Sequence, residues 1–194
     1  DRARPREGRA ARDLARKRMQ LVRCRTLQIL AIESILIRQT GSRMSSAAVK
    51  KLTAEQVEQL GFAPDVALAL ESNRAVCQVL QQQIDAIEQR IQERVSLRPE
   101  YRLLKSVPGI GEILATTIML ETGPIDRFAQ VGNFSSYCRC VDSLRESNGK
   151  KKGEGNSKNG NKYLAWAFVE AANFAQRYCP QAKSFYERKK RKTN

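Results

Sequence analysis

A heptad repeat over residues 66–95 constrains the fold more than any other feature of this chain. Its members are spaced four and three residues apart in alternation, which places them along one side of a long helix. The polar member, Asn73, is of a kind that fixes register or oligomeric state. The pattern does not decide whether this side packs on a helix of the same chain or on a helix of a second chain. The positions are Val66, Leu70, Asn73, Cys77, Leu80, Ile84, Ile87 and Ile91.

The residues before this repeat also predict helices. Residues 9–40 combine an arginine-rich first half with an apolar stripe, and Gly41 ends the pattern. Thr53 and Gln56 form a capping box, so a short helix is expected over residues 53–60. The heptad helix should itself end by Leu97, because a proline follows two residues later.

Residues 101–122 contain two apolar segments around the sequence Pro-Gly-Ile-Gly at 108–111. This arrangement resembles a helix-hairpin-helix motif. In that motif the glycine turn directs backbone N–H groups at a DNA phosphate, which makes Gly109 and Gly111 candidate nucleic-acid contacts. The alternative is an ordinary helical corner, since Pro-Gly is a general turn former.

The last part of the chain predicts further helices. We expect a short helix over 126–137 capped by Asp126, and a mostly buried helix over 162–178 capped by Asn161. A basic tail follows, whose partner is again expected to be phosphate.

No segment shows a strand-like alternation of apolar and polar residues. The expected fold class is therefore all-α. We expect long helices and a coiled-coil linker over residues 1–98, followed by a small helical domain with the hairpin-like turn over residues 99–194.

Composition favours a polyanionic partner. The net charge is +15, and basic blocks at both ends flank an acidic stretch at residues 53–100. The absence of histidine excludes a Ser-His-Asp triad, and five scattered cysteines argue against zinc. We therefore expect no metal and no cofactor in this chain. No apolar run is long enough for a membrane span, and the odd cysteine count fits a reducing cytoplasm.

The segment Ser147 to Lys162 is rich in glycine, asparagine and lysine. Such a loop suits a phosphodiester backbone, because glycine permits close approach and lysine supplies mobile positive charge. The alternative is a solvated, flexible basic loop. Ser147 is the candidate nucleophile, with Ser143 as a weaker rival. The candidate nucleic-acid contacts near it are Arg145, Lys150, Lys151, Lys152, Lys158 and Lys162.

The order of these signals resembles a known family. The sequences PGIG at 108–111, IDRF at 125–128, DSLRESNGK at 142–150 and NGNKYL at 159–164 occur in succession. Together they resemble the C-terminal part of the insertion-sequence transposases of the one-ten/eleven-eleven group, from about residue 100 to the end.

The resemblance implies a bacterial, cytoplasmic, nucleoid-associated protein whose partners are DNA and a structured guide RNA. Members join an N-terminal RuvC-like domain, whose acids bind Mg²⁺, to a helical linker and a module with a nucleophilic serine, and a structured RNA guides them to DNA. By position that serine is Ser147, although Ser147-Asn148-Gly149 departs from the commoner Ser-Gly-Gly. We expect this chain to lack the RuvC-like domain and to be inactive alone.

The expected function is therefore that of part of a DNA transposase, which cuts and rejoins DNA through a serine–phosphate intermediate. Without histidine, the basic loop would act mainly by offsetting charge on phosphorus. Homo-oligomers through the 66–95 seam are expected. The main alternative is a non-catalytic helical module for DNA or RNA binding and dimerisation, and a third is a basic scaffold for structured RNA.

Overall fold

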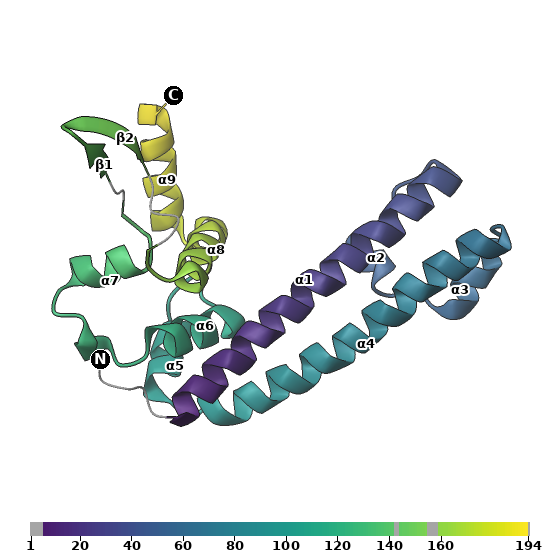
Figure 1. The fold of residues 1–194 in the computed structure, drawn as a ribbon, viewed down its shortest axis with the longest axis horizontal. Helices are drawn as coiled ribbons and strands as arrows, with labels where there is room; N and C mark the ends of the chain where they lie inside the picture. The colour runs from purple at the N-terminus through teal and green to yellow at the C-terminus, as the bar shows by residue number, and fades with distance from the viewer. Residues whose placement is uncertain (1–5, 142–143, 155–158, 194) are drawn as a thin grey trace. The chain divides into compact units, whose positions relative to one another are not determined.

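The computed structural model describes residues 6–141, 144–154 and 159–193, and helices dominate this part of the chain (Figure 1). The predicted all-α class is confirmed. Contacts divide the chain into two compact units, one of residues 13–93 and one formed by the residues on either side. The elements are α1 (Arg6–Thr40), α2 (Ser46–Val49), α3 (Ala54–Gln59), α4 (Pro64–Val95), α5 (Pro99–Lys105), α6 (Glu112–Thr122), η1 (Ile125–Arg127), α7 (Val131–Tyr137), β1 (Leu144–Ser147), β2 (Lys150–Glu154), α8 (Lys162–Tyr178) and α9 (Pro180–Thr193).

In the unit of residues 13–93, α1 and α4 lie side by side and run in opposite directions (Figure 1). Arg18 of α1 forms an ion pair with Glu88 of α4 at 2.6 Å. Seven residues further along α1, about two turns, Arg25 donates to the side chain of Gln81. The residue numbers of the two pairs have the same sum, as antiparallel register requires. The heptad seam thus packs on α1 of the same chain, which is the intramolecular alternative.

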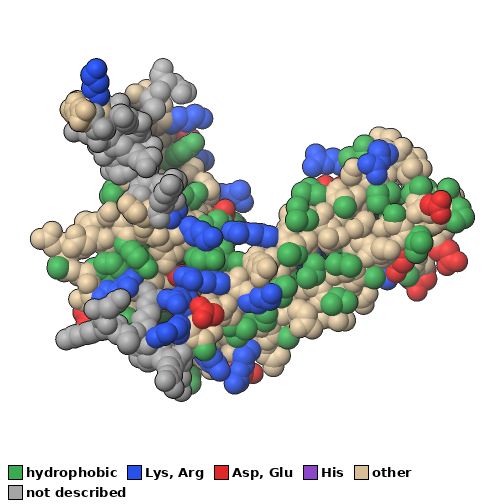
Figure 2. Space-filling view, in the orientation of Figure 1, with side chains coloured by type: hydrophobic (Ala, Val, Ile, Leu, Met, Phe, Trp, Pro, Cys, Tyr) green, Lys and Arg blue, Asp and Glu red, His purple; other side chains and the backbone are tan. Residues whose placement is uncertain are grey.

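The core of this unit lies where α2 and α3 fold back on the two long helices. Ile32 of α1 and Leu70 of α4 are fully buried in it. The predicted capping box is present, with the Gln56 amide donating to the Thr53 hydroxyl at 3.3 Å and the Thr53 amide donating to the Gln56 side chain at 3.0 Å. Acidic side chains gather over α3 and the start of α4 (Figure 2).

In the second unit, α6 forms the centre. Every residue from Leu114 to Thr122 is buried, and α5 and α8 both pack against this helix. The small side chains of Ala115 and Ala167 are completely buried, which lets helix backbones approach closely. This packing fixes the N-terminal end of α6, beside the candidate residues Gly109 and Gly111.

The prediction of a single helix over residues 126–137 is wrong. The segment forms η1 and then α7, and α7 begins without a side-chain cap, so Asp126 does not cap it. Phe128 between them is extended. Its ring lies 5.2 Å from that of Phe134 and 5.3 Å from that of Tyr137, and this aromatic packing holds the chain out of helical geometry.

The basic tail is helical. Pro180 follows the end of α8, as expected, and is also the first residue of α9. Proline is favoured at a first helical position, because its missing N–H has no acceptor there in any case. The lysines and arginines of the tail are therefore arranged around a helix.

A β-hairpin, which the lack of alternation did not predict, interrupts the helices between α7 and α8. Strands β1 and β2 are antiparallel and joined by Asn148 and Gly149. Both residues have positive φ, 53° and 70°, which is the type I′ turn that Asn-Gly favours. The sequence signal for this hairpin was therefore the Asn-Gly turn and not the pattern of the strands. Two short strands leave the fold class unchanged.

Candidate functional site

Ser147 is the last residue of β1 and directly precedes the two-residue turn. Its backbone pairs with that of Lys150, the first residue of β2, and the Lys150 side chain is exposed. The hairpin thus holds the backbone of Ser147, the candidate nucleophile, directly opposite that of Lys150, a candidate phosphate contact. Ser143 and Lys158, and the side chains of Arg145, Ser147, Lys151 and Lys152, lie outside the part of the chain that the structure describes.

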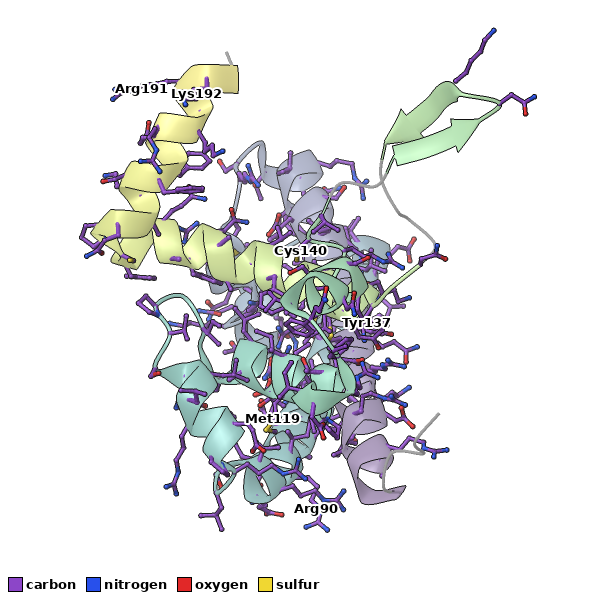
Figure 3. All side chains as sticks on the ribbon, turned by 90° about the vertical axis from the view of Figure 1, so that its left-hand side faces the viewer. Arg90, Met119, Tyr137, Cys140, Arg191 and Lys192 are labelled. Atoms are coloured by element: carbon purple, nitrogen blue, oxygen red, sulfur yellow. The ribbon has the colours of Figure 1, made fainter. Side chains whose placement is uncertain are left out.

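Five residues close the base of the segment that contains the hairpin. The Asn161 amide donates to the Tyr137 carbonyl at 2.7 Å, and Arg139 Nε donates to the Asn159 carbonyl at 2.7 Å. Gly160 has a φ of +80°, and a Cβ there would lie 2.6 Å from the Tyr137 oxygen, so only glycine fits. We call these five residues the base clamp. It joins the end of α7, at Tyr137 (labelled in Figure 3), to the start of α8.

Asn161 connects the base clamp to the core. Its Oδ1 accepts from the amides of Tyr163 and Leu164 at 2.9 and 3.2 Å and so caps α8, as predicted. Its Nδ2 donates to Oε2 of Glu121 at 2.7 Å. Asn161 is 7% exposed and Glu121 2% exposed, so this is a buried polar contact. It fixes the base of the hairpin segment relative to α6.

Sequence reasoning identified Asn161 as a helix cap but missed Glu121. The available signal was an acid near the end of a helix whose neighbouring residues are apolar. A buried carboxylate needs hydrogen-bond donors. The pattern could therefore have indicated a polar partner for Glu121, although not which residue supplies it.

Two thiols lie beside the base clamp. Burial raises the pKa of the Cys138 thiol to about 12, and it also raises the pKa of Cys140. The thiolate is the reactive form of cysteine. Cys138 therefore stays protonated near neutral pH. The assignment of Ser147 as the nucleophile stays a prediction.

The two glycines of the α5–α6 turn have different surroundings. Gly109 has a φ of +91°, and a Cβ on it would lie 2.5 Å from the Ala171 oxygen and 2.6 Å from the Ala175 nitrogen of α8. The need for glycine at 109 thus comes from packing on α8. Gly111 is the N-cap of α6, with open space where a side chain would project. The phosphate contacts predicted at Gly109 and Gly111 stay predictions.

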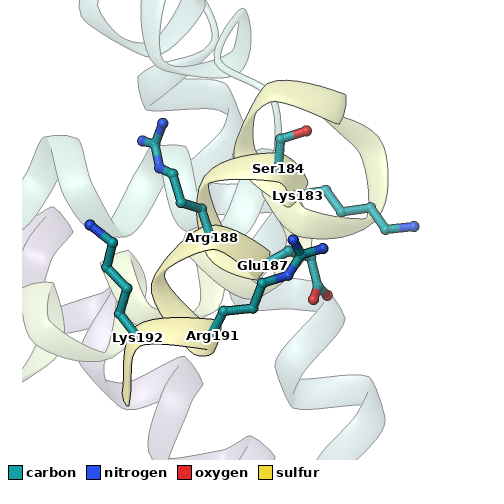
Figure 4. A pocket seen from close by; sticks show the side chains of 6 residues that line it. All are labelled: Lys183, Ser184, Glu187, Arg188, Arg191 and Lys192. Carbon is teal, nitrogen blue, oxygen red and sulfur yellow. The ribbon is translucent and has the colours of Figure 1, made fainter. Parts of the chain in front are cut away.

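The charged side chains near these elements are mostly basic. Lys162, at the start of α8, is exposed and lies 5.3 Å from the Tyr163 ring. On α9 a groove of about 520 Å³ is bordered by several cations and one acid. Figure 4 shows Arg188 and Lys192 extending to the same side of the helix. The residues of this groove are Lys183, Ser184, Glu187, Arg188, Arg191 and Lys192.

The described residues reveal no metal site and no membrane helix. No three acidic or cysteine side chains gather within this part of the chain in a way that could hold a metal ion. None of the described helices is both long and apolar enough to cross a membrane. The expectation that the chain holds no cofactor stays a prediction.

One protein-family model matches the chain. Residues 101–187, slightly less than half of the sequence, match the family described as Transposase IS116/IS110/IS902. The match supports a DNA transposase of this family. The matched segment runs from α5 into α9 and includes the α5–α6 turn, the β-hairpin and the base clamp. No curated protein matches the chain.

Proposed function

We propose that this chain supplies the nucleophile of a DNA transposase, and that the nucleophile is Ser147. The observation that carries the proposal is the position of Ser147 beside the type I′ turn of a hairpin whose base is clamped. The family match covers the hairpin and its clamp. A short turn at a fixed base suits a residue that must reach a phosphodiester without losing its orientation.

The proposed step is a substitution at phosphorus. The Ser147 oxygen forms a bond to phosphorus, the bond from phosphorus to one DNA oxygen breaks, and that oxygen leaves with a proton. The serine proton passes to a base outside the residues described above. Attack by the hydroxyl of a second strand reverses the step and frees the serine. One phosphoester bond replaces another each time, so no ATP is needed.

Cations offset the charge that develops in this step. Lys150 faces solvent directly across the turn from Ser147. We propose that it contacts the DNA backbone together with Arg145, Lys151, Lys152, Lys158 and Lys162, and that the amide groups at Gly111 contact a second phosphate. The Mg²⁺ implied by the family resemblance belongs to acids of another domain, and we assign no residue of this chain to it.

The test uses the protein together with the RuvC-like domain that the family resemblance implies. Ser147→Ala is expected to abolish denaturation-resistant protein–DNA adducts. DNA affinity should stay within about twofold of that of the unmodified protein, because one hydroxyl makes few contacts with the DNA backbone. Ser143→Ala is the matched control and should keep adduct formation. Mapping the linkage by mass spectrometry identifies the residue. Adducts that persist in Ser147→Ala contradict the proposal.

Guidance by a structured RNA is part of the same proposal. It is supported by the family resemblance and by the basic character of α1 and α9. The adduct assay with and without the element's RNA tests it, since guidance requires adducts at the chosen site only when the RNA is present. We also propose a bacterial, cytoplasmic, nucleoid-associated protein, as the same resemblance implies.

Association between copies also remains a proposal. Because α1 covers the heptad seam, a second copy would have to displace α1 or contact other side chains of α4. Leu68, Val76 and Val79 are exposed and apolar. Light scattering, which measures the mass of the particle in solution, tests for this association.

The non-catalytic binding module differs from the transposase proposal in one outcome, since it predicts DNA or RNA binding with no covalent adduct in any variant.

A further inference from the structure

A groove lies beside the α5–α6 turn, separate from the hairpin. Its volume is about 650 Å³, which is within the range of small-ligand sites. The turn at 105–111 and the first residues of α6 form one wall, and Phe174 and Tyr178 near the end of α8 form the other. The family model spans all of these residues. Gly111, proposed above as a phosphate contact, lies on the first wall, whereas the aromatic wall has no role in that proposal.

The exposure of the two aromatic side chains is unusual for their size. Tyr178 is 72% exposed and Phe174 is 38% exposed. Val107, on the opposite wall, is also exposed. Large aromatic rings are normally buried, because each removes a large apolar area from water. Two such rings open to one groove are a surface on which a planar group can stack.

The surroundings of the groove favour an anion attached to that planar group. The Arg177 guanidinium lies 5.6 Å from the Phe174 ring, and Lys105 lines the groove itself. The basic helix α9 begins two residues after Tyr178. The opposing charge is Glu112, which pairs with Lys105 at 2.9 Å. Both partners are substantially exposed, so this pair is easily exchanged for a pair with phosphate.

We infer that this groove binds an unpaired nucleotide of the nucleic acid, with its base stacked on Tyr178 and Phe174 and its phosphate facing Lys105 and Arg177. Base stacking on aromatic side chains is tolerant of sequence and needs a base that is free of its duplex partner. Strand exchange produces such bases. The inference rests on the proposed function only in that a transposase handles nucleic acid.

The experiment compares a single-stranded oligonucleotide with a blunt duplex of the same sequence, using the full chain. Tyr178→Ala is expected to weaken single-strand binding by roughly 5- to 150-fold, since stacking contributes about 1–3 kcal/mol per base. Duplex affinity should change by less than about twofold. Tyr178→Phe keeps the ring and should bind like the unmodified chain. A 2-aminopurine base in the strand should lose its quenching in Tyr178→Ala only.

Tyr186→Ala is the matched control. Tyr186 is also exposed and lies on basic α9, but it does not line the groove. Equal losses in the Tyr178 and Tyr186 variants, equal losses for strand and duplex, or no loss at all would each overturn the inference. A change in oligomeric mass without a change in single-strand affinity would assign the groove to a protein partner instead. None of these readouts depends on Ser147, so failure here leaves the proposed nucleophile unaffected.

Discussion

The two compact units are stabilised by different kinds of contact. The unit of residues 13–93 is held mainly by aliphatic side chains of α1, α2, α3 and α4, with partly buried polar pairs such as Arg18–Glu88 at its margin. The unit of α5–α9 has a glycine turn pressed on a helix backbone and a buried Glu121–Asn161 hydrogen bond near its centre.

This difference bears on where function is placed. Aliphatic packing is non-directional and tolerates side-chain changes of similar volume. A buried hydrogen bond and a backbone contact at a glycine require particular residues in one geometry. The candidate site lies in the unit with the more exacting contacts, as expected where a reacting group must be positioned.

The largest effect should come from the glycine turn. Gly109→Ala combines positive φ with overlap against α8 and should lower the free energy of unfolding by about 3–5 kcal/mol. The matched control is Gly61→Ala in the other unit, where φ is +61° and the space is open, with an expected loss of about 1–2 kcal/mol. Urea unfolding measures both. Equal losses would mean that packing on α8 does not explain Gly109.

A smaller effect is expected at the buried hydrogen bond. Asn161→Asp keeps the cap of α8 but places a second carboxylate beside Glu121, and should cost about 2–4 kcal/mol near neutral pH. The like charge favours the protonated form of the new carboxyl more strongly in the folded state than in the unfolded chain. The stability of the variant should therefore be greatest at acid pH and fall as pH rises.

Adding Glu121→Gln provides the control for this change. The glutamine amide can donate to the new aspartate, so the double variant should recover most of the stability and lose the pH dependence. Adduct formation should follow the same order if the base clamp positions the hairpin. An Asn161→Asp variant that unfolds no more easily than the unmodified chain at any pH contradicts this role.

The smallest effect is expected at the margin of the other unit. A double-mutant cycle with Arg18→Ala and Glu88→Ala should give a coupling of about 0.5–1 kcal/mol, decreasing at high salt, because both side chains are partly exposed. A coupling as large as that of the Asn161–Glu121 pair would remove the contrast between the two units.

Much of the fold could be predicted because its signals are local. The Thr53–Gln56 capping box, the Asn161 cap and the ends of the long helices each depend on residues a few positions apart. The single helix over 126–137 was wrong, because aromatic packing around Phe128 overrode local helix preference. The hairpin was missed because its signal was a two-residue turn.

For the candidate site, the sequence located Ser147 before an Asn-Gly turn and a basic segment around it. It determined the composition of the site because residue type and turn preference are properties of neighbouring residues. Only the tertiary structure decided that α1 covers the heptad seam, that Gly109 faces α8, that Glu121 holds Asn161, and that Tyr178 and Phe174 share a groove. Each of these contacts joins residues distant in sequence, and their meeting depends on how whole helices pack.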